Sequence, residues 1–319
     1  MIEKELVNFI KSFGVNFLKN SFIHNGTHHL ESNISLLKKN AISSVKIPKK
    51  VWIYWDSLQV PDLIKAIIEN NKRKNPTYEF TVLNETNLFD FIPKVDFHKD
   101  MLAAHKADYI RLKLLSTNGG IWLDATTILV DNLDWVEEMS ISNHYDLIGY
   151  YRDKSTVCKE FPIVETWFLA TGPNNYFINR WLELFSPIIK YGSKGFFEVL
   201  KSRADYKLIS QDLSNPAYLM LNMCEQIASR ELKDVNMYLK KCEDSAFFIQ
   251  ENCDWDFNRI NYVLCRQKMN IKNFPVLKLT SKDRELVEFY SKINLIKRES
   301  IIGQILNNKS NEHHNIHVE

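Results

Sequence analysis

The segment ADYIRLKLLSTNGGIWLDAT, residues 107–126, decides the fold that the sequence predicts. Its first half continues the apolar spacing of a helix over 101–117. The glycine pair at 119–120 ends that helix, because glycine accepts the left-handed conformation of a helix cap. The apolar run 121–123 then predicts a strand, and Asp124 follows it directly. An acidic residue in this position lies where open α/β sheets bind ligands.

The rest of the chain shows the same alternation of strands and helices. Short runs rich in aromatic and β-branched residues predict strands over 51–55, 78–83, 127–130, 146–151, 166–170 and 274–279. Apolar residues at helical spacing predict helices over 60–72, 175–185, 217–229 and 281–296. The first strand, helix and strand of this series are typical of a βαβ unit, so we expect an α/β fold.

Composition and charge limit the classes of function. With 41 lysine and arginine residues against 39 acidic ones, the formal net charge of +2 gives no electrostatic reason for a nucleic-acid partner. The five cysteines show no C-x-x-C spacing, so neither a disulfide framework nor a structural zinc site is expected. No apolar run at the N-terminus has membrane-spanning length. These features together predict a cytoplasmic protein.

Residues 1–20 repeat apolar side chains at helical spacing, with lysines between them. Two interpretations are open. The segment can be an interfacial helix that lies on anionic lipid, which would bring the protein to a membrane surface. It can also be a helix that packs on the body of the domain, and this is the interpretation we favour.

Asp124, Asp108 and Arg111 are the residues whose placement first suggests chemistry. A carboxylate at the edge of a pocket can hold Mg²⁺ or Mn²⁺, which prefer oxygen ligands, although an aspartate at a strand end can equally cap a turn. Asp108 and Arg111 stand one helical turn apart. They form either an exposed ion pair or, since apolar residues share their face, a buried group. A buried arginine binds a carboxylate or a phosphate.

Three motifs occur in a fixed order: IPK at 47–49 with Trp55 after it, ADYIR at 107–111, and GGIWLDAT at 119–126. In this order they resemble the capsular polysaccharide synthesis glycosyltransferases. These are part of a wider group of DXD sugar-binding transferases that includes initiating mannosyltransferases and the glucosylating clostridial toxins. The resemblance spans roughly residues 47–184. It implies a GT-A-like fold with a mixed, mainly parallel central sheet and additional helical regions.

The resemblance also implies a nucleotide-sugar donor site. Trp55 matches the tryptophan that stacks on the donor's base, a role suited to a flat aromatic face. Asp108 matches the aspartate that holds hydroxyls of the donor's sugar or ribose. Arg111 matches the arginine that steadies the sugar or the phosphate. Trp122 takes the aromatic place before the metal motif.

Asp124 matches the first aspartate of the metal-binding D-x-D motif, and Thr126 stands in the place of the second. The implied cofactor is Mn²⁺ or Mg²⁺. Because one carboxylate is missing, we expect either a lower metal affinity or a further ligand from elsewhere in the chain.

Two later segments are also similar to the family. Glu165 opens a strand that resembles the family's acceptor-side strand, and we expect it to bind an acceptor hydroxyl or, less favoured, to act as its base. A salt-bridged surface glutamate is the alternative. Residues 275–280, PVLKLT, resemble the C-terminal segment. There Lys278 and Thr280 are expected to close over the donor diphosphate, unless Lys278 is an exposed lysine at a strand end.

We expect four regions: an N-terminal helical region at 1–46, a nucleotide-sugar-binding core at 47–185, a mainly helical acceptor-side region at 186–306 that completes the site, and a polar tail at 307–319. The implied function is hexosyl transfer, with retention of anomeric configuration, from a nucleoside diphosphate sugar. UDP is the leading choice of nucleotide. The implied acceptor is a capsular or lipopolysaccharide-type glycan, which can be lipid-linked at the cytoplasmic face of the inner membrane.

Two other functions stay open from the sequence. One is a toxin-like transferase that glycosylates a protein. The other is a non-catalytic protein that binds a sugar nucleotide, which the threonine at position 126 suggests.

Overall fold

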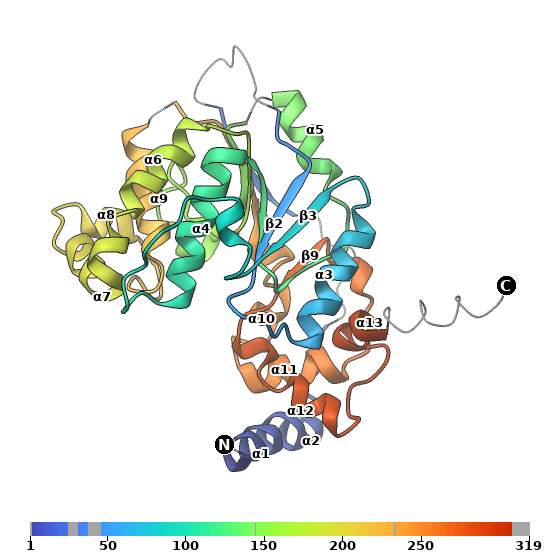
Figure 1. Ribbon diagram of the computed structural model, residues 1–319. Coiled ribbons are helices and arrows are strands. Elements are labelled where there is room, and N and C mark those ends of the chain that lie inside the picture. Colours follow the sequence, from blue (N-terminus) through green and yellow to red (C-terminus); the bar gives the residue numbers. More distant parts are fainter. Residues whose placement is uncertain (1, 25–30, 38–45, 144, 233, 308–319) are drawn as a thin grey trace.

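The computed structural model describes residues 2–24, 31–37, 46–143, 145–232 and 234–307. Its centre is a seven-stranded sheet in the order β1-β8-β6-β7-β4-β2-β3 (Figure 1). The strands are β1 (Asn33–Leu36), β2 (Lys50–Tyr54), β3 (Glu79–Leu83), β4 (Gly120–Leu123), β6 (Leu147–Tyr151), β7 (Val164–Thr171) and β8 (Met237–Lys241). Only β7 and β1 run against their neighbours, so the other five strands share one direction. The predicted mixed, mainly parallel sheet is confirmed.

Helices cover both faces of this sheet. One face carries α4 (Ala103–Asn118), α6 (Tyr176–Phe185), α7 (Ile188–Lys201), α8 (Tyr206–Ser210) and α9 (Met220–Glu231) (Figure 1). The other face carries α3 (Asp62–Lys74), α5 (Asp134–Asn143), α10 (Phe248–Asn252), α11 (Phe257–Arg266), α12 (Val287–Lys292) and α13 (Ile301–Asn307). Successive residues of a strand point to opposite faces, so Ile121 and Leu123 enter one core while Trp122 enters the other.

The βαβ unit is present as predicted, with β2 and β3 parallel in the register Lys50↔Glu79 to Tyr54↔Leu83. The glycine pair after α4 is required by its backbone. Gly119 has φ 60° and Gly120 has φ 94°. A Cβ on Gly119 would lie 2.4 Å from the backbone N of Pro173, and one on Gly120 would lie 2.6 Å from Lys50 O. Both positions therefore accept only glycine without a shift of the neighbouring chain.

Two strands were not predicted. β1 comes from the N-terminal region and pairs antiparallel with β8, which comes from the region expected to be mainly helical. β8 in turn pairs parallel with β6, so strands from beyond 47–185 complete one side of the sheet. Both strands are short, and β8 ends in two lysines, which hides the apolar signal of a strand.

The predicted continuous helix over 281–296 is wrong. The segment forms a 3₁₀ turn, η6 (Lys282–Arg284), and the short helix α12. The Asp283 carboxylate accepts a hydrogen bond from Thr280 N at 2.7 Å. A local side-chain bond of this kind stabilises a turn in competition with a continuous helix.

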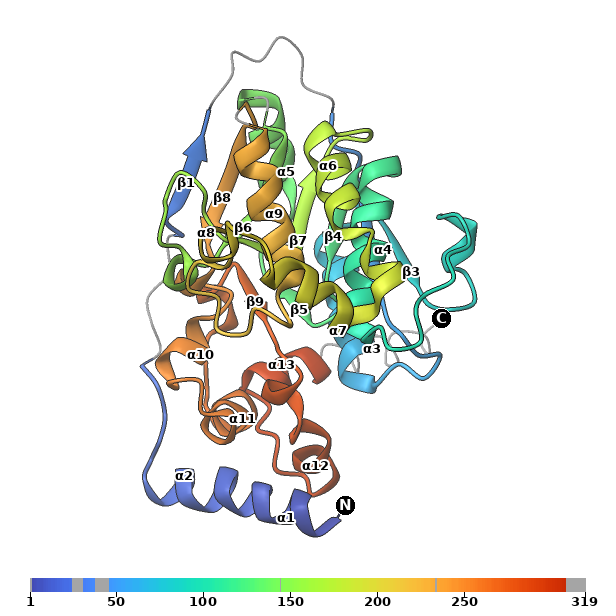
Figure 2. The same ribbon diagram turned by 90° about the vertical axis from the view of Figure 1, so that its left-hand side faces the viewer.

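The N-terminal segment packs on the body of the protein. It consists of α1 (Ile2–Ile10), a π-helical turn η1 (Lys11–Val15) and α2 (Asn16–Leu18), which lie beneath α11 and α12 (Figure 2). The Phe9 ring lies 4.8 Å from that of Phe289, and Ser12 Oγ donates to Asn258 O at 2.7 Å. The opposite side leaves Leu18 84% exposed, so the lipid interpretation of this segment stays a prediction. None of the helices in the described ranges is both long and apolar enough to cross a bilayer.

Candidate active site

Asp124 follows β4 directly, and hydrogen bonds on both sides fix its backbone. Its N–H donates to Trp167 O on β7 at 2.9 Å, and its carbonyl accepts from Thr127 N at 2.9 Å. The chain then enters β5 (Thr127–Leu129), which pairs antiparallel with β9 (Val276–Lys278) in a separate two-stranded sheet. Thr127 stands opposite Lys278 in this register. The small sheet therefore brings a residue from late in the chain to the end of β4.

The Asp124 carboxylate is held by three donors. Oδ1 accepts from Trp122 Nε1 at 2.9 Å and from Arg111 Nη2 at 3.1 Å. Oδ2 lies 3.1 Å from Lys278 Nζ. The same Nζ donates to the Thr126 hydroxyl at 2.6 Å. Lys278 is 11% exposed at its side chain, so the alternative of an exposed lysine at a strand end does not hold.

Arg111 joins two carboxylates. Its Nη1 donates to Asp108 Oδ1 at 2.7 Å, one turn earlier on α4, and its guanidinium lies 4.9 Å from the Trp122 ring centre. The Arg111 and Asp108 side chains are 5% and 13% exposed, so the pair is buried and not a surface ion pair. We call the six residues linked by these contacts the Asp124 cluster: Asp108, Arg111, Trp122, Asp124, Thr126 and Lys278.

The two aspartates of the Asp124 cluster differ in their pKa. Burial raises the pKa of Asp108 above its usual range, and the Arg111 guanidinium offsets only part of that shift. Burial also acts to raise the pKa of Asp124, but Lys278 and Arg111 together outweigh it and hold that pKa below its usual range. Asp124 is therefore ionised at neutral pH.

Glu165 lies on β7, opposite Tyr150 of β6. Burial raises the pKa of Glu165 to about 7, although Arg152 and Lys278 act to lower it, and the Asp124 charge adds to the rise. Lys278 and Asp124 are thus near enough to influence it. Among the described residues its carboxylate has neither a hydrogen-bond partner nor an ion pair, so it is not the salt-bridged surface glutamate that the sequence left open.

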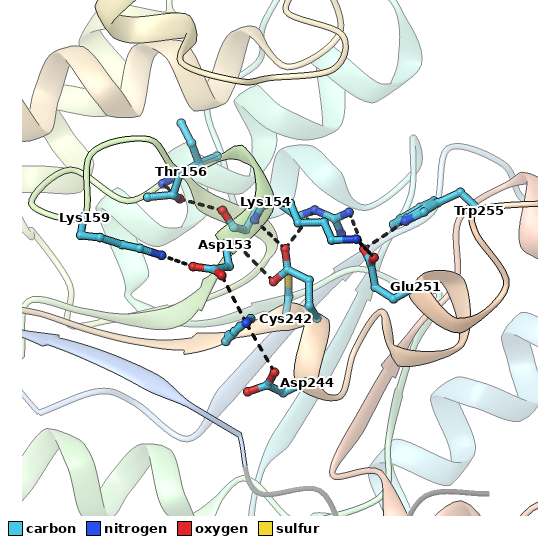
Figure 3. A network of polar contacts seen from close by, with 12 residues as sticks. Asp153, Lys154, Thr156, Lys159, Cys242, Asp244, Glu251 and Trp255 are labelled. Carbon is cyan, nitrogen blue, oxygen red and sulfur yellow. Dashed lines mark hydrogen bonds and ion pairs between the residues drawn. The ribbon is translucent and has the colours of Figure 1, made fainter. Parts of the chain in front are cut away.

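Arg152 and Glu243, whose charges both act on the pKa of Glu165, belong to a second set of charged residues. Figure 3 shows contacts of this set. Arg152 follows β6, and its Nη2 donates to Glu251 Oε1 at 2.8 Å while its Nε lies 3.4 Å from Glu243 Oε1. Glu251 also accepts from Lys154 and from Trp255 Nε1. We call this set the Arg152 network. Its two glutamates engage the guanidinium, so Arg152 only partly neutralises Glu165.

The sequence did not indicate the Arg152 network. Its members come from the end of β6, from the 3₁₀ turns η3 (Asp153–Ser155) and η4 (Cys242–Asp244), and from α10 and the residues after it, and no local motif links them. The Arg152 guanidinium lies 5.0 Å from the ring centre of Phe247 and 4.8 Å from that of Trp255. Only the packing of α10 against the end of the sheet brings these rings and the arginine together.

Trp55 and Thr280 have no direct contact with the Asp124 cluster through the hydrogen bonds and ion pairs of the described residues. Trp55 is half-buried just after β2, and the Arg284 guanidinium lies 5.4 Å from its ring centre. Thr280 holds the turn at η6 through its bonds with Asp283. Since β2 and β4 are parallel neighbours, Trp55 and Asp124 leave the sheet at the same edge.

The expected metal ion does not fit this arrangement of side chains. Asp124 is the one carboxylate of the motif 124–126, because the Thr126 side chain is neutral. Both oxygens of the Asp124 carboxylate already accept from N–H groups. Among the described residues, no group of three or more histidine, cysteine or acidic side chains could hold a metal. A cation bound at Asp124 would also be repelled by the Lys278 ammonium, which lies 3.1 Å from Asp124 Oδ2.

Comparison with protein families supports the motif assignment. The family model described as capsular polysaccharide synthesis protein matches residues 15–293. The chain belongs to this family. The matched range includes β2, the whole Asp124 cluster and Glu165, and it confirms the family that the motifs predicted.

One curated relative is the O-glycosyltransferase braB of Annulohypoxylon truncatum, 27% identical over 163 residues. The match covers 44% of this chain and 37% of that protein, so the chain spans well under two thirds of that relative's length.

Two solved structures show a weak likeness to the chain. The PaToxG glycosyltransferase is 13% identical with a TM-score of 0.34, covering 94% of this chain and 98% of that one. The apo-form glycosyltransferase GlyE of Streptococcus pneumoniae TIGR4 is 13% identical with a TM-score of 0.40, covering 84% of this chain and 64% of that one. These scores are too low to bear on the site.

Proposed function

We propose that this chain is a glycosyltransferase that moves a hexose from a nucleoside diphosphate sugar, with UDP as the preferred nucleotide, to a glycan acceptor. The observation that carries the proposal is the Asp124 cluster. It is a group of two carboxylates and two cations at the edge of the sheet, with Asp108 and Arg111 buried and Asp124 and Lys278 partly exposed, in a chain whose family is that of capsular polysaccharide synthesis. Such a group can hold both sugar hydroxyls and a diphosphate, because carboxylates accept from hydroxyls and cations bind phosphate oxygens.

Each residue of the proposed donor site has a role that suits its chemistry. Trp55 stacks on the base, and Asp108 accepts from hydroxyls of the sugar or ribose. Arg111 fixes Asp108 and Asp124 relative to each other. Lys278 neutralises the departing diphosphate, and Thr280 approaches the same group. Charge that develops on the leaving group is stabilised best by cations already in position.

Glu165 belongs to the acceptor side of this proposal. With a pKa of about 7, its ionised form is available at neutral pH to accept a hydrogen bond from the attacking hydroxyl. Transfer with retention places that hydroxyl on the same face as the departing diphosphate, whose oxygens then take the proton. In this scheme the carboxylate orients the acceptor.

The proposed acceptor is a capsular or lipopolysaccharide-type glycan. A lipid-linked acceptor would lie at the cytoplasmic face of the inner membrane, where the exposed apolar side of the N-terminal segment could make peripheral contact. Vesicles that contain anionic lipid would test this contact, since Leu18→Glu, which puts a negative charge on the exposed apolar side, should then weaken co-sedimentation.

Donor screening tests the proposal. Purified protein is incubated with a panel of sugar nucleotides, and release of nucleoside diphosphate is measured alongside calorimetric binding. Hydrolysis or transfer of one donor is the expected result. Binding of a donor with neither hydrolysis nor transfer would favour the non-catalytic alternative. Transfer to protein in preference to glycan would favour the toxin-like one.

A further inference from the structure

Arg284 is a half-buried cation for which the described part of the chain supplies no hydrogen bond or ion pair. It ends the 3₁₀ turn η6, and its Nε is buried without a hydrogen-bond partner. Burial lowers the pKa of Arg284, and the adjacent Asp283 offsets only part of that shift. A desolvated guanidinium without a carboxylate or phosphate is costly to a fold. Its donors are therefore available for an anionic ligand.

The neighbouring carboxylate is already engaged. Asp283 Oδ2 accepts from Thr280 N at 2.7 Å and from Gln250 Nε2 at 2.8 Å. Gln250 Nε2 also donates to the carbonyl of Lys278 at 2.7 Å. The same amide thus joins the turn that carries Arg284 to the strand that carries Lys278. The two cations are parts of one hydrogen-bonded unit.

Arg284 also borders the expected donor site. Its guanidinium lies 5.4 Å from the ring centre of Trp55, the residue proposed to stack on the base. Lys278 lies on the other side of the same unit, against Asp124 and Thr126. A nucleotide with its base on Trp55 and its sugar near Asp124 must carry its diphosphate between these places. A guanidinium matches phosphate oxygens in two parallel hydrogen bonds, whereas an ammonium binds them as a point charge.

Building on the proposed function, we propose that Lys278 and Arg284 neutralise the donor diphosphate in place of a divalent metal ion. Two single charges supply the formal charge of one Mn²⁺. The replacement of the metal by these two cations explains both why a metal fits poorly at Asp124 and why the Arg284 guanidinium has no acidic partner among the described residues. Asp124 in this site orients Lys278, and it does not serve as a metal ligand.

Calorimetry with nucleoside diphosphates tests the inference. UDP, GDP, ADP and CDP are titrated into the full chain, first with EDTA and then with Mn²⁺. For the tightest binder, the wild-type Kd should change by less than about threefold between the two conditions. Arg284→Met and Lys278→Met should each raise that Kd by about tenfold or more in EDTA, and the corresponding nucleoside should bind as it does to wild type. Arg284→Lys, which keeps the charge, should recover part of the loss.

Arg266 supplies a matched control. Its guanidinium also lies 5.4 Å from an aromatic ring, that of Phe13, and its Nε is also buried without a hydrogen-bond partner. Its Nη1, however, donates to Leu295 O at 2.8 Å, next to the N-terminal segment. Arg266→Met should leave the Kd unchanged, with the melting temperature of every variant recorded.

The possible outcomes separate the two proposals. Wild-type binding that requires Mn²⁺ would overturn the inference while the proposed function stands. Unchanged diphosphate binding by a folded Arg284→Met variant would also overturn the inference. So would an equal loss of affinity for the nucleoside and the diphosphate, because Arg284 would then act only by supporting the Trp55 ring. Failure of wild type to bind any of the four nucleotides in either condition would overturn the proposed function itself.

Discussion

The Asp124 cluster and the Arg152 network both contain buried or half-buried charges, but they shift the pKa of a carboxylate in opposite directions. In the Asp124 cluster two cations face one aspartate, and its pKa falls below the usual range despite burial. Beside the Arg152 network, Glu165 is buried near an arginine that two other glutamates already engage, and its pKa rises to about 7. Two carboxylates whose pKa values are pushed apart are typical of sites in which each has a separate role.

Burial alone does not decide the charge of each carboxylate. The number of nearby cations that are directed at the carboxylate, and not shared with other acids, decides it. Burial acts to raise the pKa of both. Asp124 stays ionised because Lys278 and Arg111 are directed at it, whereas Glu165 titrates near neutrality because Arg152 is shared. The following changes test that difference, from the largest expected effect to the smallest.

Asp124→Asn should reduce transfer by about a thousandfold or more, since it removes the charge that orients Lys278 with little change in shape. The measurement is turnover with the donor identified by screening, and circular dichroism checks that the fold is kept. Wild-type turnover by this variant would contradict the assignment of the whole Asp124 cluster.

Glu165→Gln should lower transfer by about tenfold to a hundredfold at neutral pH. In wild type the rate should rise as pH increases through about 7, because the ionised carboxylate accepts from the acceptor hydroxyl. The variant should lack this rise. A wild-type rate that falls over the same interval would show that the protonated form is the active one and reverse the role of Glu165.

The same substitution should stabilise the fold at high pH. The pKa of Glu165 is 4.5 in the unfolded chain and about 7 in the folded protein, so the folded state binds the proton more tightly. The stabilisation of the fold that this proton provides is fully present below pH 4.5 and is lost as pH rises through about 7. Glu165→Gln should therefore increase the free energy of unfolding by about 1 to 2 kcal/mol at pH 8. It should have little effect near pH 4.5. Urea denaturation at the two pH values measures the difference.

Arg152→Met should shift the midpoint of the wild-type pH–rate profile upward by about one unit, because it removes the cation that acts most strongly to lower the pKa of Glu165. Arg152→Lys keeps the charge and is the matched control, with a midpoint near that of wild type. If both variants kept the wild-type midpoint, the Arg152 charge would have no effect on the pKa of Glu165.

The residues that local spacing alone predicts lie close together along the chain. The helix, glycine pair, strand and aspartate of 101–124 follow from local spacing, and so does the contact of Asp108 with Arg111. Lys278 entered through the family's C-terminal motif, since no local pattern shows that β9 pairs with β5.

The remaining features depend on contacts between distant segments. The Arg152 network brings β6 to η4 and α10, and β1 and β8 are short strands that form only because each finds a partner. The sequence predicts a helix through the turn at Arg284 because apolar residues follow that turn at helical spacing. The bond from Thr280 to Asp283, which stabilises the turn, becomes visible only in three dimensions.

The pairing of β5 with β9 has a consequence for how the protein is made. A nascent chain that has left the ribosome only as far as α9 already contains Asp108, Arg111 and Asp124, but the ammonium that faces Asp124 has yet to be synthesised. Until then Arg111 is the one cation of the cluster available to two aspartates. The site is therefore completed only after Lys278 has been synthesised, when β9 docks against β5.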